Sequence, residues 1–419
     1  MSASQDKDIE FPRLRSLDVF PGQVNGDQVL CLRDPLHLTE SVVSVPRQAA
    51  VLLGLFDGRH SLLDIQEAHA RQFGSLLFRE QLIEFIGSLD EHLFLDSPRF
   101  ARHLARLKSE FRAAATRPAH LAGRAYPADP AALKNQLDGY FTASEGPGDT
   151  PPSPAGARLA GLVVPHIDFH RGGTCYAWSY REAAFALEAD RWVILGTVHA
   201  PIDRPFALTR KDFETPLGTA ENDRAVVDRL LARVGERCLD DEFAHRGEHS
   251  VEFQCVFLKH LVSGPVRIVP VLCGSLHDQV EAGRPPASGE VEEFLAALRD
   301  TLAEQGGRTV IVASADLAHV GPQFGDEDRI TSDVLRVIEQ SDRDMLAFAE
   351  AGDSEGFFRA VARDGDRRRI CGLPPIYAML RLLPGCRGRL LRYGQWPDPN
   401  GTVTFAALAM YGRQEDRNE

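Results

Sequence analysis

The amino-acid sequence predicts an α/β protein whose mainly parallel or mixed sheet is flanked by helices and preceded by a small α/β domain. Short apolar runs rich in Val, Ile and Leu alternate with helical segments in the C-terminal two thirds of the chain, as expected for strands covered on both faces. The runs are 159–166, 191–199, 266–274 and 309–319, and helical segments include 224–233 and 291–304. A length of 419 residues also exceeds one average domain, so two units are expected.

The small domain is expected over residues 1–98. Its strand candidates, VLCLRD and SVVSVP, lie on either side of a break at Asp34-Pro35. Three helical segments follow, and the second opens at Ser61, an N-cap with Asp64 three residues on. The third presents one apolar stripe, made of Leu82, Ile83, Phe85, Ile86 and Leu89. Two strands and three short helices are the parts of a winged-helix-like module.

The charge of the chain argues against a protein that binds nucleic acid. The formal net charge is −13, whereas phosphate surfaces recruit Lys and Arg. In a winged-helix protein the third helix would be the recognition helix, but here it carries Glu80, Glu84, Asp90 and Glu91 against Arg79. We therefore expect no nucleic-acid partner.

The sequence also lacks the signals of secreted and membrane proteins. The start, MSASQDKDIEFPR, does not have the basic-then-apolar order of a signal peptide, and no apolar run approaches the length of a membrane span. The seven cysteines are scattered and never spaced as C-x-x-C, so neither a disulfide framework nor a zinc knuckle is expected. These features predict a reduced, cytoplasmic protein without a membrane partner.

Within the small domain, an apolar helix is followed by L-F-D-G-x-x-S-L-x-D-I, a second helix and I-x-x-L-x-x-x-L-F-L. This pattern resembles PqqD-like domains, which recognise peptides in radical-SAM modification pathways. The resemblance implies a peptide ligand for the N-terminal domain. A small helical cap without a ligand explains the same spacing equally well.

A charged helix over residues 99–116 is expected to connect the small domain to a larger α/β domain over residues 117–413, with residues 414–419 as a tail. The stretch 143–157 is rich in Pro, Gly, Ser and Ala. We interpret it as a loop within the larger domain rather than a boundary.

Polar side chains stand where the predicted strands of the larger domain end. The first run ends at His166, the second at His199, and the last in Asp316 and His319. Ligands of open α/β sheets bind at the carboxyl ends of the strands. Each histidine alone is more often a structural hydrogen-bonding residue, but three at one edge indicate a metal site or an acid–base site.

Two further segments could line the same site. GEHSVEFQ starts a helix and places His249 and Glu252 on one face. Cys371 lies in a loop just before a helix that begins near Pro374 or Pro375, where the helix dipole favours a thiolate. Cys371 is then a nucleophile, a metal ligand or a small apolar plug.

Several familiar chemistries are not supported. The sequence has no Walker A motif, no G-x-G-x-x-G and no G-x-S-x-G nucleophile elbow, and it lacks the H-E-x-x-H of zincins. A Cys–His hydrolase or transferase stays open, because Cys371 and the histidines could meet in space.

The larger domain resembles the Memo family, whose bacterial and archaeal members are called AmmeMemoRadiSam system protein B. The resemblance rests on ordered motifs from HLAGRAYPADPAALKNQLDGYF to ICGLPPIYAML. Between them lie VVPHIDFHRGGTCYAWSY, VILGTVHAP, DFETPLGTAENDRAVVDRL, GEHSVEFQ and IVASADLAHVG. The family is similar in structure to LigB-type class III extradiol dioxygenases, so the resemblance implies that fold.

The resemblance also implies a metal bound by two histidines and a cysteine, which fall on His166, His199 and Cys371. The implied metal is Fe(II) or copper, with zinc as a further alternative, and a thiolate ligand suits Cu(I) or Fe(II). His249, Asp316 and His319 then become candidates for hydrogen-bonding support or acid–base catalysis.

Two departures from the family pattern concern residues next to the implied ligands. The family's A-G-Y after the first histidine is I-D-F-H here, so Asp168 and His170 are expected as extra polar groups near the metal. Before the second histidine, Thr197 and Val198 replace a proline and a polar residue.

Three functions follow as alternatives. The first is a metal-dependent redox or oxygen-dependent enzyme in which His249 or His319 moves protons. The second is a non-enzymatic scaffold that presents a peptide or protein to a radical-SAM enzyme, with an AMMECR-type protein as a further partner. The third is cysteine-nucleophile catalysis at Cys371 without a metal.

Overall fold

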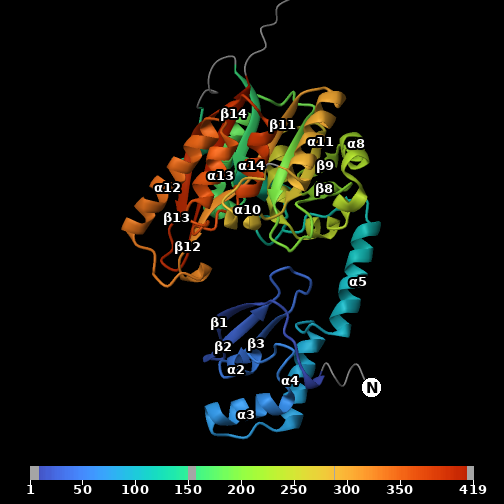
Figure 1. Ribbon diagram of the computed structural model, residues 1–419, viewed down its shortest axis with the longest axis vertical. Coiled ribbons are helices and arrows are strands. Elements are labelled where there is room, and N and C mark those ends of the chain that lie inside the picture. The colour runs from blue at the N-terminus through green and yellow to red at the C-terminus, as the bar shows by residue number, and fades with distance from the viewer. Residues whose placement is uncertain (1–8, 150–156, 287, 413–419) are drawn as a thin grey trace, which may run out of the picture. The chain divides into compact units, whose positions relative to one another are not determined.

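The structure is a computed structural model that describes residues 9–149, 157–286 and 288–412 (Figure 1). The chain divides into two compact units, Met1–Ala113 and Ala114–Glu419. Among the described residues, no helix is long and apolar enough to cross a membrane.

The first unit contains a three-stranded antiparallel sheet in the order β1-β2-β3. Its strands are β1 (Asp18–Val24), β2 (Asp27–Arg33) and β3 (Val42–Pro46). Strands β2 and β3 coincide with the two predicted segments, whereas β1 was not predicted because Pro21 and Gly22 weaken its strand character. The turn Asn25-Gly26, with φ of 53° and 92°, forms the tight hairpin that pairs β1 with β2.

The break between β2 and β3 has a side-chain cause. The Asp34 carboxylate is fully buried and accepts hydrogen bonds from the backbone N–H groups of Leu36, Leu38 and Thr39. The guanidinium of Arg15 also binds it, at 3.0 Å. One buried, neutralised carboxylate therefore organises the whole connection.

The helices of the first unit are α2 (Ala49–Leu53), α3 (Leu62–Phe73), α4 (Arg79–Glu91) and α5 (Pro98–Ala113). The predicted N-cap of α3 is present as a full capping box between Ser61 and Asp64. The α4 residues Leu82, Ile86 and Leu89 are buried in the core of this unit, and the rest of the predicted stripe is partly buried. The predicted connecting helix ends at Ala113, because Thr116–Arg117 instead form a short strand, β4, that pairs with β8.

The second unit is built on an 11-stranded mixed sheet, which confirms the predicted fold class. Its centre is parallel, in the order β5-β11-β6-β10. These strands are β5 (Arg158–Val164), β6 (Arg191–Thr197), β10 (Val266–Cys273) and β11 (Thr309–Ser314). The remaining strands flank this centre: β7 (Phe206–Leu208), β8 (Asp212–Thr215), β9 (Gly218–Asn222), β12 (Asp316–Val320), β13 (Arg387–Trp396) and β14 (Thr402–Gly412).

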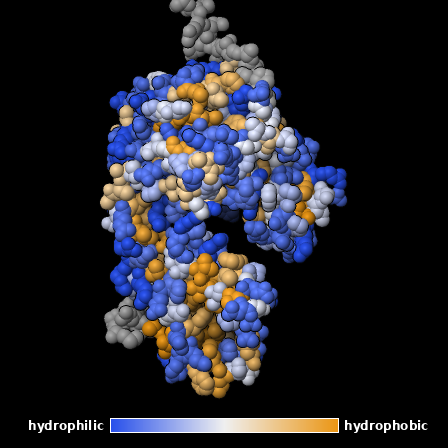
Figure 2. All heavy atoms as spheres, turned by 180° about the vertical axis from the view of Figure 1, so that it is seen from behind, coloured by the Kyte–Doolittle hydropathy of each residue, from blue (hydrophilic) through white to orange (hydrophobic). Residues whose placement is uncertain are grey.

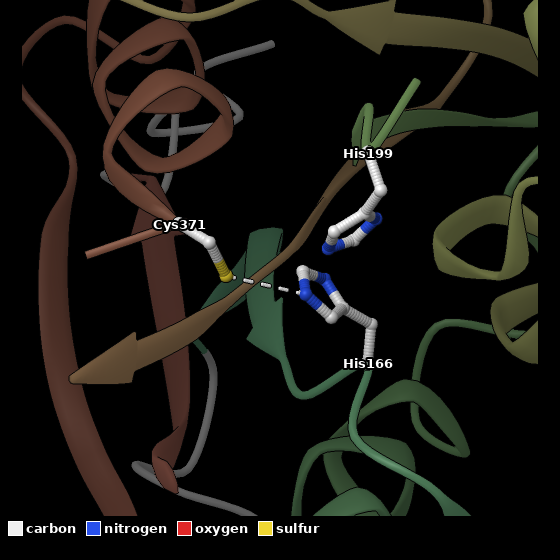
Figure 3. A group of neighbouring side chains, drawn as sticks. All are labelled: His166, His199 and Cys371. Atoms are coloured by element: carbon white, nitrogen blue, oxygen red, sulfur yellow. Dashed lines mark hydrogen bonds between the residues drawn. The ribbon is translucent and has the colours of Figure 1, made fainter. Parts of the chain in front are cut away.

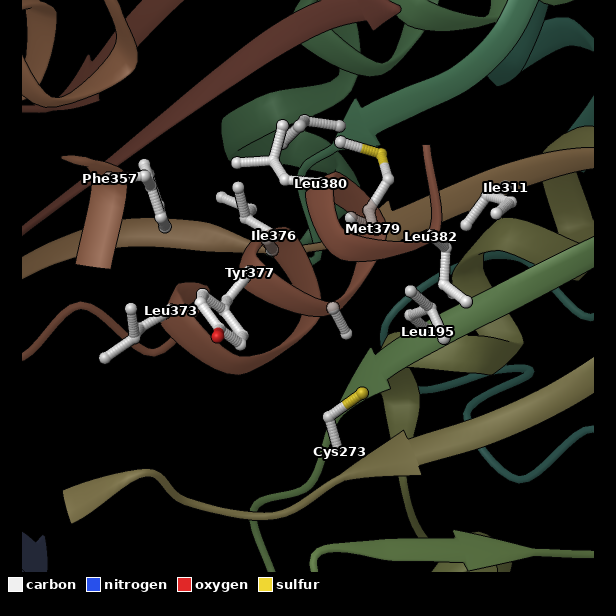
Figure 4. Packing of buried hydrophobic residues seen from close by; sticks show 14 of the residues in the cluster. Leu195, Cys273, Ile311, Phe357, Leu373, Ile376, Tyr377, Met379, Leu380 and Leu382 are labelled. Carbon is white, nitrogen blue, oxygen red and sulfur yellow. The ribbon is translucent and has the colours of Figure 1, made fainter. Parts of the chain in front are cut away.

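Helices cover both faces of this sheet, so its central strands are apolar on both sides. The helices are α6 (Pro130–Thr142), α7 (Phe169–Ala183), α8 (Arg224–Val234), α9 (His249–Leu261), α10 (His277–Glu281), α11 (Glu290–Gln305), α12 (Ser332–Glu350), α13 (Ser354–Ala362) and α14 (Leu373–Leu382). One core cluster joins the sheet to α8, α11, α13 and α14, and a second joins it to α6, α7 and α9. Figure 4 shows Leu195 and Ile311 of the sheet beside Met379 and Leu382 of α14.

The run 309–319, which was predicted to be one strand, is two strands. Strand β11 ends at Ser314, and β12 starts at Asp316 and pairs antiparallel with β14. The single residue between them, Ala315, donates its N–H to Val164 at the end of β5. Asp316 therefore stands directly at the carboxyl edge of the parallel strands, whereas His319 lies within the next strand.

Candidate metal centre

Three side chains next to the ends of separate elements converge at the carboxyl edge of the sheet. His166 follows β5, His199 follows β6, and Cys371 precedes α14; their ligand atoms all lie within 4.8 Å of one another (Figure 3). The Cys371 Sγ lies 3.3 Å from the Nε2 of His166. Metal bonds of about 2.0–2.3 Å place ligand atoms about 3–4 Å apart, so this spacing fits one ion.

The hydrogen bonds of His166 leave its Nε2 available to a metal. Its Nδ1 lies 3.0 Å from the carbonyl oxygen of Ser314, which can only accept, so Nδ1 carries the proton. The ring is buried, and burial together with the charge of His199 lowers the pKa of His166 to about 3. His166 is therefore neutral at physiological pH, as a metal ligand must be.

His199 is oriented by a residue that the sequence analysis did not single out. The Glu248 carboxylate accepts the backbone N–H of His199 at 2.8 Å, and the Nδ1 of His199 lies 3.1 Å from both of its oxygens. This arrangement also fixes the proton on Nδ1 and leaves Nε2 as the ligand atom. Partial burial opposes a charged ring, but the Glu248 carboxylate raises the pKa of His199 above its usual value.

Glu248 occupies the N-cap position of α9 and serves two histidines at once. It accepts the backbone N–H of Ser250 at 3.0 Å, and its Oε1 lies 3.2 Å from the Nδ1 of His249. Burial alone would raise its pKa, but the charges of His199 and His249 hold the pKa of Glu248 well below its usual range. Glu248 lies within the motif GEHSVEFQ, from which only His249 and Glu252 were proposed as site residues.

His249 lies beside the three converging side chains. Its ring stacks on His199 with 4.6 Å between centroids and lies 5.3 Å from the ring of His166. Burial lowers the pKa of His249 to about 3. Glu252, expected on the same helix face, instead lies away from this group and forms a buried ion pair with Arg117.

The position of Cys371 depends on the glycine that follows it. The N–H of Gly372 donates to the carbonyl of Asp316 at 3.0 Å. A Cβ at Gly372 would lie 2.4 Å from that oxygen and 2.7 Å from the Cβ of Ala315, so only glycine permits this approach. On the other side, the hydroxyl of Thr197 donates to the carbonyl of Cys371 at 3.2 Å.

The dipole of α14, which we expected to favour a Cys371 thiolate, is opposed by the burial of the thiol. Burial raises the pKa of the Cys371 thiol well above its usual value, and the nearby carboxylates of Asp316 and Glu248 raise it further. Both effects act against the dipole of α14, a helix of ten residues. Without a cation in the site, Cys371 is a protonated thiol.

Asp316 lies against His166. Its Oδ1 accepts the backbone N–H of His166 at 3.0 Å, and its Oδ2 lies 3.6 Å from the Nε2 of that histidine. Burial raises the pKa of Asp316 to about 6, which suits a group that exchanges a proton near neutral pH.

His319 lies further along β12, where its Nδ1 is 3.1 Å from the carbonyl of Leu317 and its ring packs on Phe324. Burial lowers the pKa of His319. The charge of His199 lowers this pKa as well, which places His319 within electrostatic range of the centre without a direct contact to its ligand atoms.

The two extra polar residues of I-D-F-H have different positions. Asp168 precedes α7, and its charge partly opposes the lowering of the His249 pKa by burial, so it faces the same region. His170 is exposed, accepts a hydrogen bond from the Nε of Arg171 at 3.3 Å and packs on Trp396. His170 is therefore apart from the three converging side chains.

A cleft of about 290 Å³ opens beside His199 and Cys371. Its walls are both polar and apolar and include Thr197, Val198, Cys273, Leu276, Ile370 and Leu373. His199, whose side chain is 41% exposed, stands at this opening. A small molecule can therefore reach His199 and Cys371 from solvent.

Comparison with known proteins places the second unit in one family. Residues 117–406 match the family described as Memo-like protein. A MEMO1 family protein of Aquifex aeolicus is 26% identical over 405 residues, which cover 96% of this chain and all of the relative. MEMO1 family proteins of Methanopyrus kandleri and Methanosarcina mazei are 31% and 30% identical over 298 and 295 residues, covering 69% of this chain and 96% of each relative.

The two archaeal relatives thus correspond in length to the second unit, whereas the Aquifex alignment extends over the first unit as well. The matched region contains His166, His199 and Cys371 together with Glu248, Asp316 and His319. The chain belongs to the Memo-like family.

Proposed function

We propose that this protein binds a redox-active transition metal through the Nε2 atoms of His166 and His199 and the Sγ of Cys371. The observation that carries the proposal is the pair of fixed tautomers: both rings donate from Nδ1 to an oxygen, and their ligand atoms lie within 4.8 Å of each other and of the Cys371 Sγ. Imidazole and thiolate donors suit Fe(II) or copper, with zinc as a further alternative. Such an ion would supply redox or Lewis-acid chemistry with positions left open for a substrate.

The residues around this centre have distinct roles in the proposed enzyme. Glu248 orients His199 and His249, while the Ser314 carbonyl orients His166. Asp316, His249 and His319 are the candidates for moving protons, and Asp316 has a pKa of about 6 after burial raises it. The cleft beside His199 would admit a small substrate.

A cysteine nucleophile acting without metal is less well supported. Such catalysis needs a thiolate near neutral pH, but burial and the carboxylate of Asp316 raise the pKa of Cys371. A bound cation is the simplest way to stabilise a thiolate at this position.

Metal content of protein purified without oxygen tests the proposal. We expect iron or copper close to one ion per chain in the wild type and a loss of most of it in the double variant His166→Ala, Cys371→Ala. The matched control is His170→Ala, Cys273→Ala, which removes one histidine and one cysteine outside the three ligands. Wild-type protein without a transition metal, or equal metal in the two double variants, would contradict the proposal.

The first unit supports a second candidate function, the presentation of a peptide or protein to a radical-SAM enzyme, with an AMMECR-type protein as a further partner. It contains a groove of about 460 Å³ lined by Phe11, Ile83 and Leu95, with Asp96 and Arg99 among its charged residues. Figure 2 shows apolar surface gathered on this unit. Exposed apolar side chains there include Val19, Val42, Leu63, Leu76 and Phe78.

If the first unit presents a peptide or protein, a complex with a radical-SAM protein should still form with the variant His166→Ala. The complex should be lost with Ile83→Asp, because an aspartate would place a charge in the groove. Affinity measured by calorimetry with both variants separates the two functions. If His166→Ala abolishes the complex and Ile83→Asp leaves it intact, the groove is not the binding site.

A further inference from the structure

The first strand of the second unit contains a fully buried arginine that contacts the segment carrying Glu248. Arg117 lies in β4 and none of its side chain is exposed. Its Nε donates to the carbonyl of His245 at 2.9 Å, and its Nη2 donates to the carbonyl of Glu248 at 2.9 Å. One planar guanidinium therefore holds both ends of the segment that precedes α9.

The guanidinium is itself held by Glu252 in the first turn of α9. The two side chains form an ion pair that is fully buried on both sides. Glu252 also accepts the backbone N–H of Leu121 at 2.9 Å and the hydroxyl proton of Tyr126. With all its contacts satisfied, Arg117 has one available position, as a buried charge requires.

These contacts extend to the candidate metal ligand through Glu248. Arg117 fixes the backbone of Glu248, and the Glu248 side chain binds both the backbone N–H and the Nδ1 of His199. From the opposite side, the Ser250 hydroxyl donates to the carbonyl of Thr197 at 2.7 Å. The glycine at 196 permits this close packing, since a Cβ there would lie 2.6 Å from the Ser250 Oγ.

We propose that Arg117 is a positioning residue for the metal centre, acting through Glu248 to hold His199 with its proton on Nδ1 and its Nε2 toward the ion. The inference rests on the proposed metal-binding function and adds a residue far from the ligands in sequence. A lysine cannot replace it, because one ammonium group cannot reach two carbonyls and a carboxylate in the fixed geometry of a guanidinium.

Arg117 lies four residues after the end of α5, the last helix of the first unit. The segment between α5 and Arg117 is fastened to the second unit: Lys211 donates to the carbonyl of Ala114 at 2.6 Å, and Thr116 donates to Glu214 at 2.7 Å. Residues 114–117, which follow the first unit in the chain, are therefore held in place within the second unit. A change in the conformation of residues 114–117 would alter the orientation of His199.

The test compares Arg117→Lys with Arg191→Lys in the full-length protein. Arg191 is the matched control because it is also a buried arginine, bonded to the carboxylate of Asp223 and the carbonyl of Gly306, but it lies at the opposite end of β6 from His199. Each variant replaces a buried guanidinium group that makes several hydrogen bonds with a single ammonium group. Only Arg117→Lys is expected to affect His199.

Two readouts are measured, Co²⁺ affinity by competition with a chelator and the tautomer of His199 in metal-free protein by ¹⁵N NMR. For Arg117→Lys we expect Co²⁺ affinity to fall about tenfold and the Nδ1-protonated form of His199 to be partly lost. Arg191→Lys should match the wild type in both. If Arg117→Lys does not fold, Tyr126→Phe, which removes one donor to Glu252 without changing any charge, takes its place.

An unchanged tautomer and unchanged Co²⁺ affinity in the folded variant would overturn the inference. An equal change in Arg191→Lys would overturn it too, since the effect would then reflect general destabilisation. If the wild type binds no Co²⁺ at all, the metal proposal fails, and the tautomer of His199 still decides whether Arg117 positions this ring.

Discussion

Replacing Cys371 with serine is expected to lower the affinity for Zn²⁺ by about a hundredfold, since one ligand of a tightly bound zinc contributes on the order of 3 kcal/mol. Serine keeps nearly the same size, so the loop held by Gly372 and Thr197 should stay in place. The measurement is a competition titration with a chelator of known affinity.

The same variant should lose part of the pH dependence. Burial raises the pKa of the Cys371 thiol above its usual value, so the thiol is protonated throughout the range from pH 6 to 8 and must release its proton when the metal binds. Wild-type affinity should therefore rise about tenfold per pH unit on account of this proton. A serine hydroxyl keeps its proton, so Cys371→Ser should reduce the slope of log K against pH by about one.

Cys273→Ala is the control for this experiment. Cys273 lines the same cleft, and burial also raises the pKa of its thiol, but it is not among the three converging side chains. Its replacement should leave both the affinity and the pH slope unchanged. If Cys273→Ala and Cys371→Ser behave alike, the thiol of Cys371 is not the ligand.

Replacing Glu252 with leucine is expected to destabilise the second unit by about 3–5 kcal/mol. The substitution leaves the guanidinium of Arg117 as a buried, uncompensated charge and removes the acceptor of the Tyr126 hydroxyl and the Leu121 N–H. The result should be a large fall in the urea midpoint of this unit.

Tryptophan fluorescence reports this transition selectively. All three tryptophans of the chain, at positions 178, 192 and 396, lie in the second unit. Glu355→Gln is the control, because Glu355 pairs with Arg359 on the exposed face of α13 and surface pairs contribute little. Similar midpoints for Glu252→Leu and Glu355→Gln would show that the buried pair is not required for stability.

Much of the second unit could be predicted from its sequence because local patterns and global structure agree there. The apolar runs ending at His166 and His199 became parallel strands on either side of β11, so their carboxyl ends lie at the same edge of the sheet. The ends of α8 and α11 lay within one residue of the predicted segments. The spacing and composition of apolar residues are sufficient to predict such elements, because a strand that is buried on both faces must be apolar along its whole length.

Prediction was less complete where a tertiary contact overrides local preference. Strand β1 contains Pro21 and Gly22 and forms because the Asn25-Gly26 turn sets it against β2. The run at 309–319 was expected to be continuous, but it changes partner at Ala315, where β11 ends in the parallel sheet and β12 joins β14. A single sequence does not show which strands pair with each other in the folded protein.

The sequence by itself determined the α/β fold, the family resemblance and the candidates His166, His199 and Cys371. Only the tertiary structure decided how those side chains function: which ring nitrogen carries the proton, that Glu248 orients His199, that Arg117 holds Glu248, and that the Cys371 thiol is protonated. The physical reason is that proton positions and pKa values depend on burial and on neighbouring dipoles and charges within a few ångströms. Here two of those neighbours, Arg117 and Glu248, contact each other although they are 131 positions apart in the chain.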